Sequence, residues 1–206
     1  YGRPETAPRF IGALLRYYRK PEERDPDTAF TLLDAICHLP PQYYDEATRG
    51  ELIEFAAWFA RSEELRLQVA ALLFLREAER SLPQDHPQLR RIVEIARQIP
   101  QNSLPLVFLQ YRILRRARED VSLHRRQLYE RDVTGEVFLD NLKIATPWIA
   151  KVVGIELLRD QVEHGLMDHI LHISTHFSNL VKVSERVVVR HNAGDALVRI
   201  LPRLRR

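Results

Sequence analysis

The stretch SEELRLQVAALLFL, residues 62–75, decides the fold class of this chain. Its apolar residues recur at three- and four-residue steps, with Leu65, Val69 and Leu72 on one side, which is the spacing of an amphipathic helix. Ser62 is suited to cap the N-terminus of this helix, and Pro83 marks its end. We therefore predict a helix from about residue 63 to residue 82.

Helical spacing of apolar residues extends outward from this stretch over almost the whole chain. Asp27 and Ser103 are suited to cap further helices. Alternating β-branched runs are few and the chain has only seven glycines, so an all-β fold is not expected. The sequence predicts an all-α protein, with further helices over about 9–20, 28–39, 45–60, 87–98, 104–119, 121–131, 137–145, 147–165, 166–182 and 185–201.

Two segments, 62–76 and 184–201, carry a resemblance to a known family. In each, small alanine or glycine residues let a paired helix approach while valine and leucine fill the gap, as in VVVRHNAGDAL at 187–197. Both segments resemble the second helix of a HEAT or armadillo repeat, and the Leu-Pro pairs at 39–40 and 82–83 lie 43 residues apart, within the period of such repeats. The resemblance implies antiparallel helix pairs stacked as a HEAT-like α-solenoid with a groove for a partner. Residues 84–165 depart from a regular repeat, which leaves an irregular helical bundle as the alternative.

Length and composition are those of a globular chain. Its 206 residues suit a single all-helical domain over 1–206. The chain begins at Tyr1 and its one methionine is Met167, so we expect it to be a fragment of a longer protein. One cysteine, Cys37, excludes an internal disulfide and a cysteine zinc site. No run of eighteen apolar residues occurs, so no membrane span is expected, and the cytoplasm is the default compartment.

Positive charge is concentrated in two places. Residues 112–126 carry six arginines against two acidic residues, and residues 186–206 carry six against one. In the first segment, helical spacing puts Arg112, Arg115 and Arg116 on one face, with Arg125 and Arg126 shortly after. Arginine forks suit carboxylates and phosphates, so these five residues are candidates for contact with a protein partner or a nucleic acid. A solvated helix face that binds nothing is the alternative.

Histidines gather near residue 170. His169, His172 and His176 share one face of the expected helix, and Asp168 lies one turn from His172. Imidazoles one turn apart can ligate zinc or a similar divalent ion, and a carboxylate can complete the set. The alternative is a stripe of hydrogen-bonded histidines at the edge of the buried face, because no His-Glu-x-x-His motif is present.

No motif identifies an enzyme. The chain has no Gly-x-Ser-x-Gly elbow and no Gly-rich phosphate loop. The resemblance to HEAT or armadillo repeats implies a non-catalytic protein-interaction, scaffold or regulatory module with another protein as partner. No cofactor is expected. Two alternatives stay open: a nucleic-acid-binding module that uses the arginine face, and a metal-dependent enzyme that uses the histidines.

Overall fold

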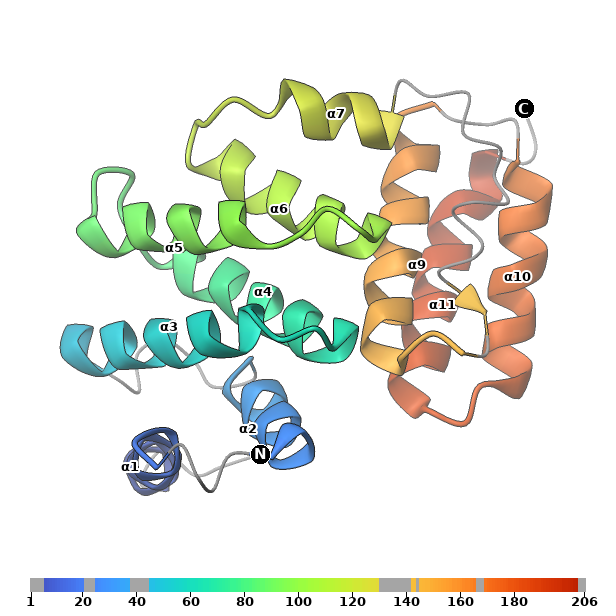
Figure 1. The fold of residues 1–206 in the computed structure, drawn as a ribbon. Helices are drawn as coiled ribbons and strands as arrows, with labels where there is room; N and C mark the ends of the chain where they lie inside the picture. Colours follow the sequence, from blue (N-terminus) through green and yellow to red (C-terminus); the bar gives the residue numbers. More distant parts are fainter. Residues whose placement is uncertain are drawn as a thin grey trace. The chain divides into compact units, whose positions relative to one another are not determined.

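The computed structural model describes residues 6–20, 25–37, 45–129, 142–143, 145–165 and 169–203. Within these ranges the chain forms ten α-helices and no strand, so the predicted all-α fold class is confirmed (Figure 1). The helix expected over 137–145 falls largely outside the described residues. The α-helices are α1 (Ala7–Tyr18), α2 (Pro26–Cys37), α3 (Glu46–Ala60), α4 (Leu65–Arg80), α5 (Pro87–Gln98), α6 (Leu104–Arg116), α7 (Ser122–Tyr129), α9 (Trp148–Glu163), α10 (Ile170–Val183) and α11 (Val187–Ile200).

The helices form two compact units. Unit 1 comprises residues 1–100 and 112–120, and unit 2 comprises residues 101–111 and 121–206. Helix α6 therefore contributes its first two turns to unit 2 and its last residues, from Arg112, to unit 1. The expectation of a single domain stays a prediction.

Helix α4 is the centre of unit 1. It packs against α2, α3 and α5, while α3 also contacts α1 and α5 (Figure 1). Because it has neighbours on several sides, most of its residues are buried, including Val69, Leu72 and Phe74. The stretch 62–75, whose apolar spacing predicted a helix with a buried face, thus contributes to the core of unit 1.

Two predicted helix caps are wrong in detail. The backbone N–H of Thr28 donates to Asp25 Oδ1 at 2.9 Å, so Asp25 caps α2, while Asp27 lies in the first turn and pairs with Arg66. Ser62 Oγ accepts from the N–H of Glu64 at 3.2 Å, and α4 begins only at Leu65. Both errors arise because several side chains near a helix start can accept a backbone N–H, and the turn before the helix selects among them.

Helix α6 ends three residues earlier than expected. The N–H of Glu119 donates to the carbonyl of Leu114 and the N–H of Arg118 to that of Arg115, which is the hydrogen-bond pattern of a Schellman motif. Arg118 adopts the left-handed conformation, with φ of 60°. This position is usually glycine, which is why the sequence did not mark the end of the helix.

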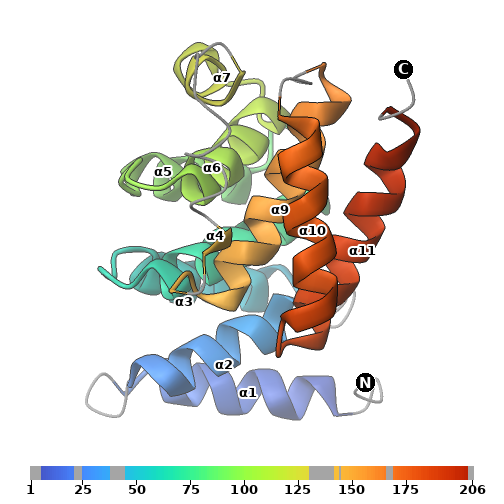
Figure 2. The ribbon, with the colours of Figure 1, turned by 90° about the vertical axis from the view of Figure 1, so that its right-hand side faces the viewer.

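Unit 2 is built around α9, α10 and α11. Helix α11 packs against both α9 and α10 (Figure 2), and Phe177 of α10 is fully buried. Helix α7 is tied to α9 by two side chains: Gln161 donates to the carbonyl of Leu128 at 2.7 Å, and Tyr129 donates from its hydroxyl to Asp160. Among the described helices of both units, none combines the length and apolar character that a membrane span requires.

Candidate anion-binding site

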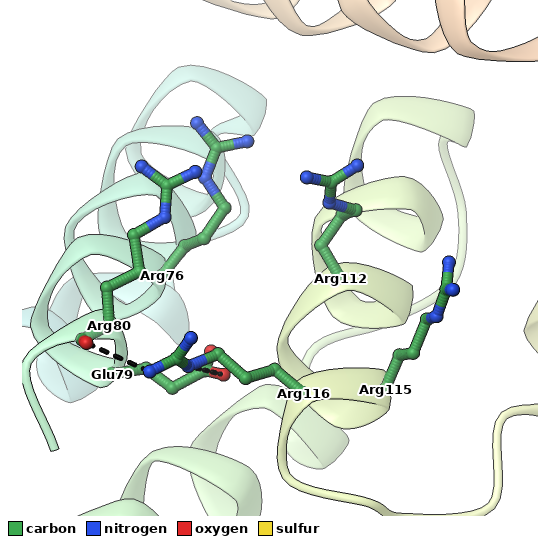
Figure 3. A pocket seen from close by; sticks show the side chains of 6 residues that line it. All are labelled: Arg76, Glu79, Arg80, Arg112, Arg115 and Arg116. Carbon is green, nitrogen blue, oxygen red and sulfur yellow. Dashed lines mark hydrogen bonds and ion pairs between the residues drawn. The ribbon is translucent and has the colours of Figure 1, made fainter. Parts of the chain in front are cut away.

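Three of the arginines predicted from the sequence line one pocket. Arg112, Arg115 and Arg116 project from the end of α6, and α4 supplies the opposite wall (Figure 3). The pocket has a volume of about 430 Å³ and lies within unit 1. We call it the arginine pocket; its described lining residues are Arg76, Glu79, Arg80, Arg112, Arg115 and Arg116.

The wall from α4 follows from helical spacing. Arg76, Glu79 and Arg80 stand three and four residues apart, so they share one face of the helix. The rest of α4 is packed into the core of unit 1, which fixes the direction of this face. The side chain of Arg76 is 14% exposed and that of Arg80 is 52% exposed. Arg76 is therefore the more buried of the two arginines in this wall, and Arg80 is the more accessible to solvent.

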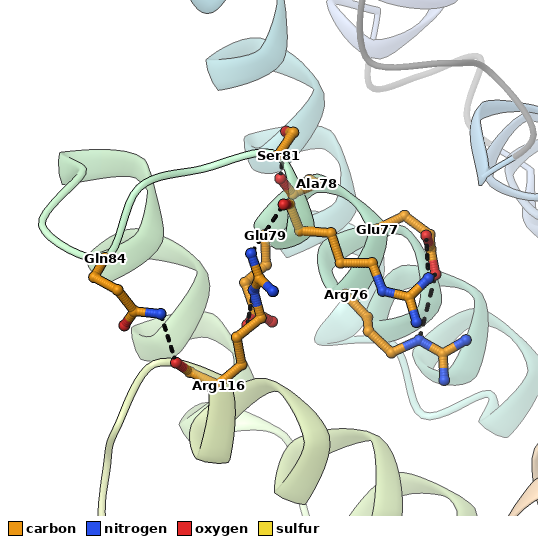
Figure 4. A network of polar contacts seen from close by, with 8 residues as sticks. Arg76, Glu77, Ala78, Glu79, Ser81, Gln84 and Arg116 are labelled. Atoms are coloured by element: carbon orange, nitrogen blue, oxygen red, sulfur yellow. Dashed lines mark hydrogen bonds and ion pairs between the residues drawn. The ribbon is translucent and has the colours of Figure 1, made fainter.

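Arg116 connects the two walls. Its Nε lies 3.2 Å from Glu79 Oε1, and its Nη2 donates to the carbonyl of Arg80 at 2.9 Å (Figures 3 and 4). Gln84 in turn donates from Nε2 to the carbonyl of Arg116 at 2.9 Å (Figure 4). Arg97 and Glu119 form a further ion pair next to the end of α6. The contacts of Arg116 join the end of α6 to α4, and the Arg97–Glu119 pair joins it to α5.

Glu79 is a buried carboxyl group in this charged wall. Its side chain is 1% exposed, and neither carboxylate oxygen accepts a hydrogen bond of good geometry from the described residues. Burial raises the pKa of Glu79 to about 7, although Arg116, Arg80 and Arg76 act in the opposite direction. Desolvation prevails because the charged form loses water that the ion pair with Arg116 does not replace.

Glu77 restrains the two α4 arginines that line the pocket, Arg76 and Arg80. Its carboxylate lies 3.5 Å from Arg76 Nε and 2.9 Å from Arg80 Nη1 (Figure 4). The pocket lining itself carries five guanidinium groups and one carboxyl group, and its described residues include no apolar or aromatic side chain. Such an arrangement is chemically suited to an anion, because planar guanidinium forks pair with carboxylate or phosphate oxygens.

The other two predicted arginines are not part of this pocket. Arg125 and Arg126 lie exposed on α7, in unit 2. Conversely, no pattern in the sequence marked Arg76, Glu79 or Arg80 as part of a site. Their spacing on α4 is visible in the sequence, but only the fold brings that face opposite the end of α6.

The candidate histidine ligands lie at the N-terminus and along the first half of α10. His169 is the residue before the helix, and its ring stacks on that of His172 with centroids 6.4 Å apart. His172 and His176 are exposed, and Asp168 lies outside the described residues. Within the part of the chain that the structure describes, no three histidine, cysteine or acidic residues are placed to hold one metal ion. The metal site stays a prediction.

A second polar cluster, which the sequence did not reveal, lies between α7 and α9. Tyr129 donates to Asp160, and Nδ1 of His164 lies 2.7 Å from the backbone oxygen of Asp160. Tyr129 also packs edge-on against Tyr111. These contacts attach α7 to its unit, and we assign them a structural role.

The arginine pocket is therefore the site whose geometry points most directly to a ligand. It joins residues from two helices that are distant in sequence, and its charge selects an anion. Comparison with known proteins adds nothing to this site, since no protein-family model, no curated protein and no solved structure matches the chain.

Proposed function

We propose that the chain is a non-catalytic protein-interaction module that holds an acidic segment of a partner protein in the arginine pocket. The observation that carries the proposal is the convergence of five arginines from α4 and α6 on one pocket. Clusters of arginine are a recurring means of recognising acidic and phosphorylated protein segments. In this proposal the helices are stacked in pairs in the manner of a HEAT-like α-solenoid and serve as the rigid support.

The pocket is suited to binding and not to turnover. Five of its six described lining residues are arginines, whose guanidinium groups do not transfer protons near neutral pH. In this proposal a carboxylate of the partner contacts arginines from two helices. The pocket therefore selects for negative charge and also fixes the position of the carboxylate.

Exposed apolar side chains support the assignment to an interaction module. On α10 and α11, Leu171, Val183 and Val187 are among the most exposed large apolar residues. A second cavity of about 340 Å³ in unit 1 is lined in part by Trp58, which is 41% exposed, and Arg61. Surface that combines exposed apolar or aromatic side chains with arginine is typical of protein-interaction sites.

The test is a pull-down with charge-reversed protein. Wild type, Arg112→Glu/Arg115→Glu and the control Arg90→Glu/Arg199→Glu are incubated with nuclease-treated lysate of the source cells. The control makes the same change in net charge at exposed arginines outside the pocket. We expect wild type and control to retain a partner that the pocket variant loses, and its binding segment, mapped by proteolysis, to be acidic. Equal retention by all three proteins contradicts the proposal.

Nucleic-acid binding is a second candidate, favoured by the exposed arginines Arg115, Arg125 and Arg126. It predicts that the bound material disappears on nuclease treatment and that affinity falls steeply with rising salt. The same pull-down without nuclease separates the two candidates.

The third candidate is a metal-dependent enzyme that uses His169, His172 and His176 with Asp168. It requires stoichiometric zinc or another divalent ion in the untagged protein. Elemental analysis that finds less than about 0.1 metal ion per chain, far below the one ion that such a site holds, rules it out.

A further inference from the structure

We propose that the arginine pocket takes a phosphomonoester dianion, carried on a phosphorylated side chain of the partner, and that this dianion replaces Glu79 as the partner of Arg116. Glu79 then takes up a proton from water and stays in the wall as the neutral acid. The inference rests on the proposed function and specifies its ligand. No covalent bond is formed or broken; one proton moves from solvent to Glu79 as one dianion binds.

The charge of the pocket matches a dianion better than a carboxylate. Five guanidinium groups face one carboxyl group in the lining, and Glu77 is already shared between Arg76 and Arg80. A phosphomonoester carries a charge of about −1.5 to −2 and three acceptor oxygens, so it can accept forks from α4 and α6 together. A single carboxylate offers two oxygens and one charge.

The size and composition of the pocket favour a phosphorylated side chain over nucleic acid. Its volume of about 430 Å³ falls in the lower part of the range of small-molecule sites, about 300–1,000 Å³, which admits a phosphate with its stem. The described lining residues include no aromatic ring on which a base could stack. A phosphodiester also carries one charge where a phosphomonoester carries nearly two.

Glu79 is placed to respond when the dianion binds. Its Oε1 is 3.2 Å from Arg116 Nε, so a ligand that engages this guanidinium brings negative charge next to a buried carboxylate. The charged groups that act most strongly on Glu79 are Arg76, Arg80 and Glu77 of α4 and Arg116 of α6. Like charges this close disfavour joint ionisation, and Glu79 already has a pKa of about 7 because of its burial. Proton uptake therefore costs little near neutral pH.

The experiment uses titration calorimetry with the probe acetyl-Gly-phosphoSer-Gly-amide at pH 7.5 and 8.5. The second pKa of the phosphate is about 6, so the probe is a dianion at both values. For wild type we expect Kd to rise nearly tenfold over this interval, because each pH unit above the pKa of Glu79 costs about a factor of ten. Buffers of different ionisation enthalpy should show uptake of nearly one proton per ligand at pH 8.5.

The matched variants isolate Glu79. Glu79→Gln should bind the probe with a Kd that does not change between the two pH values and with no proton uptake. The control Asp85→Asn removes an exposed carboxylate outside the pocket and should behave as wild type. A wild-type Kd independent of pH, without proton uptake, overturns the proposal; this measurement needs no variant and so stands if Glu79→Gln does not fold.

Two further probes complete the test. Inorganic phosphate distinguishes a phosphorylated side chain from free phosphate as the ligand, and a hexaglutamate peptide distinguishes failure of the phosphate inference from failure of the proposed function. Inorganic phosphate should bind at least tenfold more weakly than the phosphoserine peptide, and equal binding refutes a phosphorylated side chain as the ligand. If the phosphoserine peptide does not bind while a hexaglutamate peptide binds and is lost in Arg112→Glu/Arg115→Glu, the phosphate inference fails and the proposed function stands. If neither peptide binds and the pull-down is insensitive to charge reversal, both fail.

Discussion

Arg118 ends α6 in a backbone conformation that glycine usually supplies. Its φ of 60° lies in the left-handed region, where a Cβ is crowded by the neighbouring carbonyl oxygen. The two Schellman hydrogen bonds at Leu114 and Arg115 compensate for this strain. The residue bears on the proposed binding site because Arg112, Arg115 and Arg116, in the last turns before it, line the pocket.

Arg118→Gly is expected to raise the free energy of unfolding by about 0.5–1 kcal/mol, since glycine adopts this conformation without strain. Urea denaturation measures the change. Arg118→Ala is the control, because it removes the side chain and keeps the Cβ, and it should leave stability nearly unchanged. An equal gain in both variants would attribute the effect to loss of the charge and not to the backbone.

At the scale of elements, α3 and α5 are joined by a two-pronged ion pair. Arg91 donates from Nε to Glu54 Oε1 at 2.6 Å and from Nη2 to Oε2 at 2.8 Å. This hydrogen bonding lowers the pKa of Glu54 below its ordinary 4.5, while partial burial acts against it. Bidentate geometry makes this pair one of the stronger surface contacts of unit 1.

Glu54→Gln is expected to lower the free energy of unfolding at pH 7 by about 0.5–1 kcal/mol, because both partners are more than a third exposed and solvent screens the pair. A carboxyl group whose pKa is lower in the folded state stabilises above the pKa of the unfolded chain. The difference between wild type and variant should therefore shrink as the pH falls below 4.5. Urea denaturation between pH 3 and pH 7 checks this trend.

Asp85→Asn is the matched control for the ion pair, since it removes one exposed negative charge elsewhere in unit 1. It should change stability little at any pH. A pH dependence of the same size in this control would show that net charge, and not the contact with Arg91, is responsible.

At the scale of the molecule, the two compact units each have a buried core. Leu72 and Phe74 are buried in unit 1, and Val153 and Phe177 are buried in unit 2. The cores consist largely of different helices, although α6 contributes buried residues to both, so we expect each unit to lose its packing through its own local opening. The arginine pocket belongs to unit 1 alone.

Phe177→Ala is expected to destabilise unit 2 by about 3–5 kcal/mol, because the fully buried ring leaves a cavity. Hydrogen exchange should accelerate by about two to four orders of magnitude in α9–α11 and change little in α4. Leu171→Ala, on the same helix but 69% exposed, is the control and should change neither. Equal acceleration in α4 would contradict independent opening and favour the single domain expected from the sequence.

The all-α class and the approximate position of most helices could be predicted from the sequence alone. That information is local: apolar residues at three- and four-residue steps, as in Leu65, Val69 and Leu72, define a helix and its buried face without reference to the rest of the chain. The prediction was wrong at helix ends. Asp25 and not Asp27 caps α2, and Arg118 adopts the left-handed conformation that glycine usually supplies. Several side chains near a helix end can accept backbone hydrogen bonds, so the sequence does not specify which one does.

Which charged residues come together in one pocket depends on the packing of the helices. Arg112, Arg115 and Arg116 were predicted from one helix face, but their partners Arg76, Glu79 and Arg80 lie more than thirty positions away in the sequence and carry no motif. Packing brings α4 opposite the end of α6, and the same packing buries Glu79 and raises its pKa. Burial and long-range contact are properties of the folded chain, and no local pattern encodes them.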